Sequence, residues 1–227
     1  NGYGEVEVIF DDEMTGTVEG KVQYARDKTD YGNWLDMAKL TIESGNFDIE
    51  IDDQSEGKNA SIEIVNGSFT SDVSAYLAKD SNLVKDEKGN FVVMDETEFE
   101  ESAKEFYISD EDDLKLAIAN QADGVTWVLK NSFEVSGMIF INTDVTIEGN
   151  DETLTFTGKI YGAGGGKNSF IEVEDGADVV IKDLTLDGDS SVEGSEKVKH
   201  GINVFSYEED DRITSVTVDN VKIVNCG

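Results

Sequence analysis

The apolar residues in the first third of the chain follow a pattern that repeats after 22 residues. The segments KLTIESGNF and SIEIVNGSF share it, so that Leu40 corresponds to Ile62 and Phe47 corresponds to Phe69. In each segment apolar and polar residues alternate before a glycine, which is typical of a short β-strand that buries one face. A short strand cannot bury that face alone, so the period predicts stacked turns of a solenoid.

A second pattern repeats after 37 residues near the end of the chain. The segments VVIKDLTL and VTVDNVKI share it, and Val179 corresponds to Val216. Each copy has two alternating stretches that meet at a polar corner, formed by Asp183 in the first copy and by Asp219 and Asn220 in the second. Residues 145–156 carry the same pattern with a few extra residues at the bend. We therefore expect these three segments to lie above one another, with their apolar residues in shared columns.

Polar insertions separate these segments and predict loops that project from the stack. The two insertions are residues 159–168 and 188–200. Loops on a rigid scaffold commonly carry binding residues. We expect ligand contacts near four residues of these insertions, namely Tyr161, Lys167, Asp189 and His200. Trp34 lies in another polar stretch, where two interpretations stay open: its ring stacks on a sugar, or it packs over a loop against the coil beneath.

The segment SDEDDLKLAIANQADG predicts a helix over about residues 109–122. Ser109 is a suitable N-cap, acidic residues fill the first turn, and Leu114 and Ile118 share one face. A helix at this position would cover the open end of a β-stack, where unpaired strand edges invite aggregation.

These features predict two units. Residues 1–94 form the end of a first solenoid unit, which closes with a hairpin that turns at residues 87–90. Residues 95–227 form a second unit, with an acidic link before the helix. The expected fold class is all-β, a right-handed parallel β-helix with a short α-helical cap at the N-terminal end of the second unit.

Charge restricts the partners of this chain. It has 227 residues, of which 50 are acidic and 18 are basic, and its formal net charge is -32. A field of this sign repels phosphate backbones and anionic lipid surfaces, so we expect no nucleic-acid partner. The sequence has no apolar run of about 20 residues, so we expect no direct membrane insertion. With one cysteine, Cys226, the chain cannot form an internal disulfide.

Two stretches of the sequence resemble known families. The run IEIVNGSFTSDVSAYLAKDSNLVKDEKGNFVV resembles the coil-ending element of large surface proteins from Gram-positive gut bacteria. The run DEDDLKLAIANQADGVTWVLKNSFEVSGMIFINTDVTIEGN resembles the opening of pectate-lyase-like β-helix domains. This resemblance implies a β-helix fold and a secreted or cell-surface location. It leaves the activity open, because similar domains serve as adhesins, stalks and carbohydrate-active enzymes.

A partial catalytic pattern is present as well. Asp144, His200 and Arg212 occur in the order in which polygalacturonases present a catalytic carboxylate, a histidine and a substrate-binding arginine. The paired aspartates before the histidine are missing, Lys199 stands where that family has glycine, and Thr214 replaces its lysine. Glycoside hydrolysis needs two carboxylates held across the scissile bond. We therefore assign no catalytic residue and expect no enzymatic activity.

Calcium is the one ion for which the sequence offers ligands. Asp187 and Asp189 carry carboxylates that could contribute to the 6 to 8 oxygens that calcium takes. Their spacing matches no complete calcium loop, so weak calcium binding and solvated loop charge stay open as interpretations. We expect no other cofactor.

The expected function is that of an extracellular surface-protein module, structural or adhesive, which contacts a host or environmental glycan or protein through its loops. Two alternatives stay open. One is a carbohydrate-active enzyme of the polygalacturonase or lyase type. The other is a filament subunit whose end coils pair with those of neighbouring copies.

Overall fold

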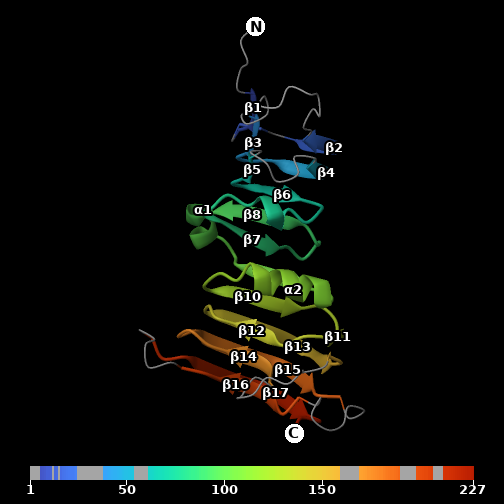
Figure 1. The fold of residues 1–227 in the computed structure, drawn as a ribbon, viewed down its shortest axis with the longest axis vertical. Coiled ribbons are helices and arrows are strands. Elements are labelled where there is room, and N and C mark those ends of the chain that lie inside the picture. Colours follow the sequence, from blue (N-terminus) through green and yellow to red (C-terminus); the bar gives the residue numbers. More distant parts are fainter. Residues whose placement is uncertain are drawn as a thin grey trace, which may run out of the picture. The chain divides into compact units, whose positions relative to one another are not determined.

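The chain folds mainly into β-strands, most of which pair in parallel, as seen in a computed structural model (Figure 1). The structure describes residues 6–11, 13–14, 16–24, 38–53, 61–158, 169–189, 198–206 and 212–227. At this level the expected all-β class is confirmed. The chain divides into two compact units, Asn1–Ala103 and Lys104–Gly227, which we call unit 1 and unit 2.

Unit 1 contains two sheets to which the chain contributes strands in turn. The smaller sheet is parallel and has the order β1 (Val6–Phe10), β3 (Ala38–Ile42), β5 (Ser61–Ile64). The larger sheet has the order β2 (Thr17–Tyr24), β4 (Asn46–Asp53), β6 (Gly67–Phe69), β8 (Phe91–Asp95), β7 (Ser81–Lys85). Its first two pairings are parallel and its last two are antiparallel. A 3-10 turn, η1 (Ser74–Tyr76), precedes β7.

The strand register of unit 1 follows the 22-residue period. Strands β3 and β5 pair Leu40 with Ile62, and β4 and β6 pair Phe47 with Phe69. Register partners in a parallel ladder share a face, so these side chains lie in columns. The rings of Phe47 and Phe69 are stacked with their centroids 4.9 Å apart. Gly67 has a φ of +140°, and a Cβ there would lie 3.0 Å from the Phe69 ring, so the column needs a glycine at this position.

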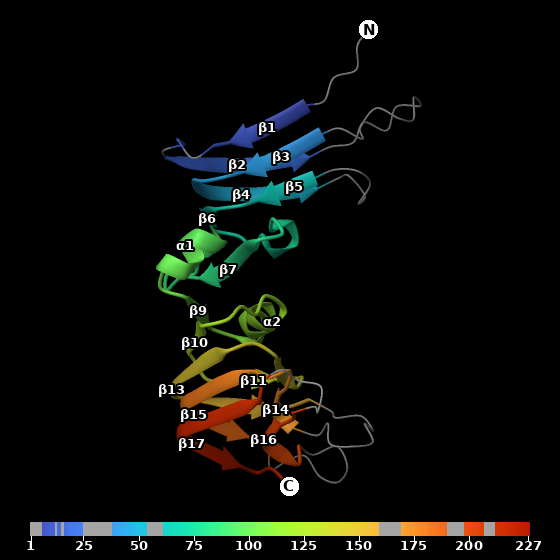
Figure 2. The same cartoon turned by 90° about the vertical axis from the view of Figure 1, so that its left-hand side faces the viewer.

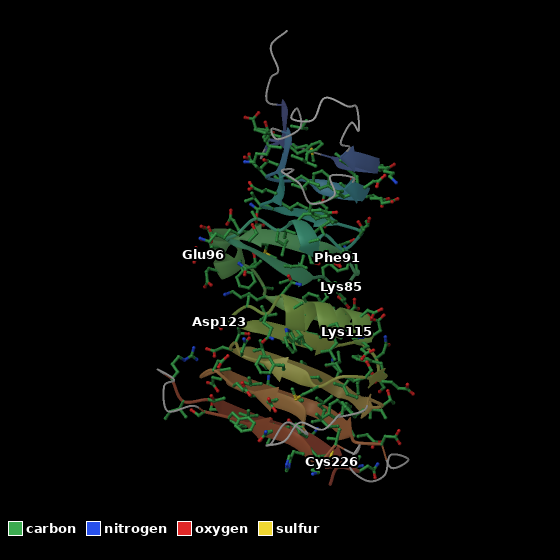
Figure 3. The ribbon with its side chains drawn as sticks, viewed as in Figure 1. Lys85, Phe91, Glu96, Lys115, Asp123 and Cys226 are labelled. Carbon is green, nitrogen blue, oxygen red and sulfur yellow. The ribbon has the colours of Figure 1, made fainter. Side chains whose placement is uncertain are left out.

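The parallel stack of unit 1 ends at β6, after which β7 and β8 form the expected hairpin. The side chain of Asp86 holds the turn, because its Oδ1 accepts hydrogen bonds from the N–H groups of Lys88 and Asn90 at 2.9 and 2.8 Å. Lys85 and Phe91 flank the turn, and the Lys85 Nζ lies 5.2 Å from the Phe91 ring centroid (Figure 3). The predicted hairpin is therefore confirmed.

A short helix, α1 (Glu96–Glu101), replaces the acidic link that the sequence predicts after residue 95. Asp95 caps it by accepting a hydrogen bond from the Glu98 N–H at 2.9 Å. Phe99 is buried, and the helix contacts β7 and β8. This packing joins α1 to unit 1 and places the division of the chain at residues 103 and 104, where the sequence predicted 94 and 95.

Unit 2 contains two sheets in which every pairing is parallel among the described strands. The larger sheet has the order β9 (Glu105–Ile108), β10 (Val125–Leu129), β13 (Val145–Phe156), β15 (Asp178–Asp187), β17 (Ser215–Val224), and β11 (Phe133–Val135) also pairs with β13. The smaller sheet has the order β12 (Ile139–Ile141), β14 (Ser169–Val173), β16 (His200–Val204). Strands β13, β15 and β17 lie side by side (Figure 2).

The register of β15 and β17 follows the 37-residue period and pairs Val179 with Val216. The register of β13 and β15 shifts between Glu148 and Glu152. Residues 149–151 of β13 lie between these two positions, whereas Asp183 alone fills the equivalent place in β15. This is the bend at which the sequence predicts extra residues, so the predicted columns of unit 2 are confirmed as register partners.

Helix α2 (Glu111–Ala119) lies within the range in which the sequence predicts a helix. Its N-cap is Asp110 and not the expected Ser109, because the Asp110 Oδ1 accepts from the N–H groups of Asp112 and Asp113 at 3.1 and 3.0 Å. The helix contacts β9, β11 and β12. Neither α1 nor α2, nor any other helix in the described ranges, has the length and apolar character needed to cross a bilayer.

Glu111 ties the start of α2 to the end of β11. Its Oε1 accepts hydrogen bonds from the N–H and the hydroxyl of Ser136, both at 2.5 Å. The Nζ of Lys115, which is labelled in Figure 3, lies 2.9 Å from the Oε2 of Glu111. The hydrogen bond from the Ser136 hydroxyl lowers the pKa of Glu111 to about 2, outweighing the opposite effect of burial, and the Ser136 N–H and Lys115 lower it further. The folded state therefore favours the ionised carboxylate.

We predict that Glu111→Gln destabilises unit 2 by about 1 kcal/mol at neutral pH, the net value of a typical hydrogen bond. Because the pKa is lowered on folding, the stabilisation is complete above pH 4.5 and is lost as the pH falls towards about 2. Urea unfolding followed by circular dichroism between pH 7 and pH 2 measures both effects. Asp112→Asn is the control, because the Asp112 side chain is 96% exposed on the same turn. Equal losses in the two variants would contradict the prediction.

Candidate functional site

The starts of successive strands in the larger sheet of unit 2 carry polar side chains that bond to one another. We call Asp123, Asp144, Asp178 and Ser215 the start ladder. The Asp123 Oδ1 accepts from the Asp144 N–H at 2.9 Å, and the Asp144 Oδ1 accepts from the Asp178 N–H at 2.8 Å. The Asp178 Oδ1 accepts from the Ser215 hydroxyl at 2.5 Å. Each carboxylate thus holds the backbone or side chain of the next level of the stack.

Arg212 lies against the middle of the start ladder. Its Nη2 is 2.7 Å from each carboxylate oxygen of Asp144, although the two residues are 68 positions apart in the chain. The two side chains are 55% and 33% exposed. Partial burial alone would raise the pKa of Asp144, but the Asp178 N–H and Arg212 lower it below its ordinary value. The bond to Asp144 raises the pKa of Arg212, and the charges of Asp123 and Asp178 act in the same direction.

A second ladder occupies the bends of the same strands. We call Asn150, Asp183 and Asn220 the corner ladder, and their φ angles are 52°, 48° and 51°. Asparagine and aspartate adopt this left-handed conformation more readily than other non-glycine residues. The Asn220 Nδ2 donates to the Asp183 Oδ1 at 2.6 Å, and the Asn150 Nδ2 donates to the Leu129 carbonyl at 2.8 Å. The polar corners that the sequence predicts are therefore confirmed.

The predicted calcium ligands lie at the end of β15. The Asp187 Oδ1 accepts from the Asp189 N–H at 3.0 Å and from the Asn225 Nδ2 at 2.7 Å. The carboxylate of Asp187 thus bonds within its own turn and to the next level. In the part of the chain that the structure describes, no three histidine, cysteine, aspartate or glutamate side chains lie together in a way that could hold a metal ion. Calcium binding at Asp187 and Asp189 stays a prediction.

The structure brings together part of the polygalacturonase-like pattern. Asp144 and Arg212 are in contact, whereas His200 is exposed at the start of β16, where its register partner is Ser169. Among the described residues, no hydrogen bond or ion pair joins His200 to Asp144 or Arg212. Thr214 is buried, and its hydroxyl accepts a hydrogen bond from the Gly176 N–H at 3.0 Å. The contacts of Asp144 and Arg212 hold the levels of the stack together.

The predicted ligand contacts fall partly outside the described residues. Tyr161, Lys167 and Trp34 lie outside them, so their roles stay predictions. Asp189 is described, with intermediate exposure and a φ of 58°, and His200 is exposed. Both belong to the insertion at 188–200 from which the sequence predicts binding.

Strand β14 contains a buried carboxyl group that the sequence does not single out. The side chain of Glu172 is fully buried, and its Oε2 accepts from the Ser169 hydroxyl at 3.1 Å. Its Oε1 has no hydrogen-bond partner among the described residues. In the segment SFIEV, Glu172 alternates with Ile171 and Val173, a pattern typical of a solvent-facing residue. Burial of a carboxyl group with one unbonded oxygen lowers stability.

Comparison of the chain with protein-family models, with curated proteins and with solved structures finds no match. The resemblance to pectate-lyase-like domains and to bacterial surface proteins therefore stays a prediction.

Removal of the Arg212 guanidinium tests the start ladder as a structural element. We predict that Arg212→Gln lowers the urea midpoint of unit 2 in low salt, and that the loss shrinks in about 1 M sodium chloride, where exposed ion pairs are screened. Lys199→Gln, a change of equal charge at an exposed residue before β16, serves as the control and should leave the midpoint unchanged. A loss that is the same in low and high salt would contradict the prediction.

Proposed function

We propose that this chain is a segment of a right-handed parallel β-helix that acts as a structural or adhesive module of an extracellular surface protein. Parallel strands, apolar register partners and polar ladders at the strand starts and bends support this fold. Helix α2 acts as the cap of unit 2. Its apolar face is buried at Leu114 and Ala117, and it contacts β9 and two further strands.

The observation that carries the proposal is how the polar side chains of unit 2 are used. The hydrogen bonds of the start ladder and the corner ladder run from one level of the stack to the next. Such contacts stiffen a stack, because each level fixes the backbone of its neighbour. A stiff stack leaves contact with other molecules to the segments between its strands, as in other proteins that place variable loops on a rigid scaffold.

Net charge restricts the class of partner that we propose. With a net charge of -32, the chain repels nucleic acid and anionic lipid, and its partner is a neutral or cationic glycan or protein. Calcium is the proposed ion, because divalent cations relieve repulsion among carboxylates such as Asp187 and Asp189. The location we propose is the cell surface or the extracellular medium.

The contact between Asp144 and Arg212 favours carbohydrate cleavage as a second candidate function, because it joins two members of the polygalacturonase-like order. His200, the third member, has no bond to either residue in the described part of the chain. The structural and adhesive function therefore stands first.

A glycan array and a panel of extracellular-matrix proteins, probed with the labelled chain in calcium or in chelator, test the proposal. We expect binding that falls at least tenfold when residues 160–167 and 190–197 are each replaced by a short Gly-Ser linker. The control is Thr217→Ala, at an exposed position of β17, which should keep full binding. Binding that survives both loop replacements would contradict a loop-borne adhesive site, and release of reducing ends from polygalacturonate would favour the enzyme.

A further inference from the structure

A buried carboxyl group lies in the middle strand of the smaller sheet of unit 2. Strand β14 pairs with β12 on one side and with β16 on the other. Its residue Glu172 has no exposed surface, and the Ser169 hydroxyl donates to the Glu172 Oε2 at 3.1 Å. The Glu172 Oε1 has no hydrogen-bond partner in the described part of the chain. A buried carboxylate of this kind is unfavourable unless a positive charge compensates it.

Further oxygen atoms lie on the same face of this sheet as the carboxylate of Glu172. Glu174 is 6% exposed, and its N–H continues the ladder by donating to the Ile141 carbonyl at 3.0 Å. Side chains two residues apart in an extended chain share a face, so the two carboxyl groups are neighbours. Asn203 of β16 is the register partner of Glu172, so its amide lies beside the carboxylate. With the Ser169 hydroxyl, these groups form a set of oxygen donors.

Burial restricts the ligand of this set to a small ion. A sugar ring or a peptide does not reach a buried oxygen atom, whereas a single ion is enclosed between neighbouring side chains. Carboxylate, amide and hydroxyl oxygens are the ligands of hard cations such as calcium and magnesium. Magnesium requires near-ideal octahedral geometry and keeps several waters, whereas calcium accepts irregular sets of 6 to 8 oxygens. Calcium therefore fits a buried, irregular set better.

We propose that Glu172, Glu174 and Asn203 bind a calcium ion on the smaller sheet of unit 2. The ion supplies the positive charge that the Oε1 of Glu172 lacks, and it links β14 to β16 through their side chains. No three acidic, histidine or cysteine side chains of the described residues lie together, so neutral oxygens complete the coordination. We therefore expect a dissociation constant of about 0.1 to 1 mM, as in extracellular calcium modules. This site is separate from Asp187 and Asp189, and it does not depend on the proposed function.

The test compares the thermal midpoints of the wild type and of Glu172→Gln, in chelator and in about 5 mM calcium. Sodium chloride at about 0.15 M screens diffuse binding of calcium to the surface charge. In chelator, Glu172→Gln should be the more stable protein, because a neutral amide costs less to bury than an uncompensated carboxylate. In calcium the order should reverse, because the bound ion raises the midpoint of the wild type by about 5 °C.

Titration calorimetry with calcium chloride measures the affinity of the site directly. Glu172→Gln and Glu174→Gln should each weaken calcium binding at least tenfold, because each removes one of the two carboxylates. Glu134→Gln makes the same charge change at an exposed residue of β11, and should leave both the affinity and the midpoints unchanged. Asp187→Asn should keep the reversal of stability, which separates this site from the calcium ligands of the proposed function.

Circular dichroism checks that every variant is folded. If Glu172→Gln does not fold, Glu174→Gln carries the same comparison, because its carboxylate belongs to the same site. Calcium that raises the midpoints of the wild type and of the folded variant equally acts on the surface charge alone, and this result would overturn the proposal. A wild-type midpoint that calcium leaves unchanged would overturn it as well.

Discussion

Each level of this protein depends on the level beside it, because a three- to twelve-residue strand in an alternating pattern has one apolar face and cannot bury it alone. Burial comes from a register partner in the next strand: Phe47 stacks on Phe69, and Ile181 lies between Ile147 and Val218. A register slip by one residue would turn the whole apolar face outward, so the register is strongly constrained. The parallel columns are therefore the interaction on which both units depend.

The polar ladders also constrain the strand register, through contacts that lie outside the core. A chain with 50 acidic residues must place carboxylates close together, and unit 2 does so by letting them accept hydrogen bonds from the following level. Cations reduce the remaining repulsion locally, as Arg212 does beside Asp144 and as Lys182 does at 3.5 Å from Glu148. The same bonds fix the start and the bend of each strand, so they also stabilise the register. This use of carboxylates supports the structural role that we propose.

The sequence predicts the parts of this structure that repeat. The pairing of Leu40 with Ile62 and of Val179 with Val216 follows from the 22- and 37-residue periods of the sequence. The bend at Asp183 was predictable because aspartate tolerates a positive φ. Helix α1, which belongs to no repeat, was missed. Helix α1 has one buried apolar residue, Phe99, and therefore gives no periodic signal.

Contacts between segments that are far apart in the chain could not be predicted from the sequence either. The bond between Arg212 and Asp144 depends on how the chain returns after 68 residues, and the burial of Glu172 depends on what lies over β14. A single sequence records neither. For the same reason it predicted Ser109 as the cap of α2, since Ser109 and Asp110 are both suitable caps and only the backbone decides between them.

Cysteine cross-linking tests the parallel register most directly. In a Cys226→Ser background, Thr185→Cys with Lys222→Cys places two thiols on register partners of β15 and β17, and Thr185→Cys with Thr217→Cys places them out of register. A disulfide needs Cα atoms about 4.4 to 6.8 Å apart. The account predicts rapid disulfide formation under mild oxidation in the first pair alone. Formation in the second pair, or in neither, would contradict it.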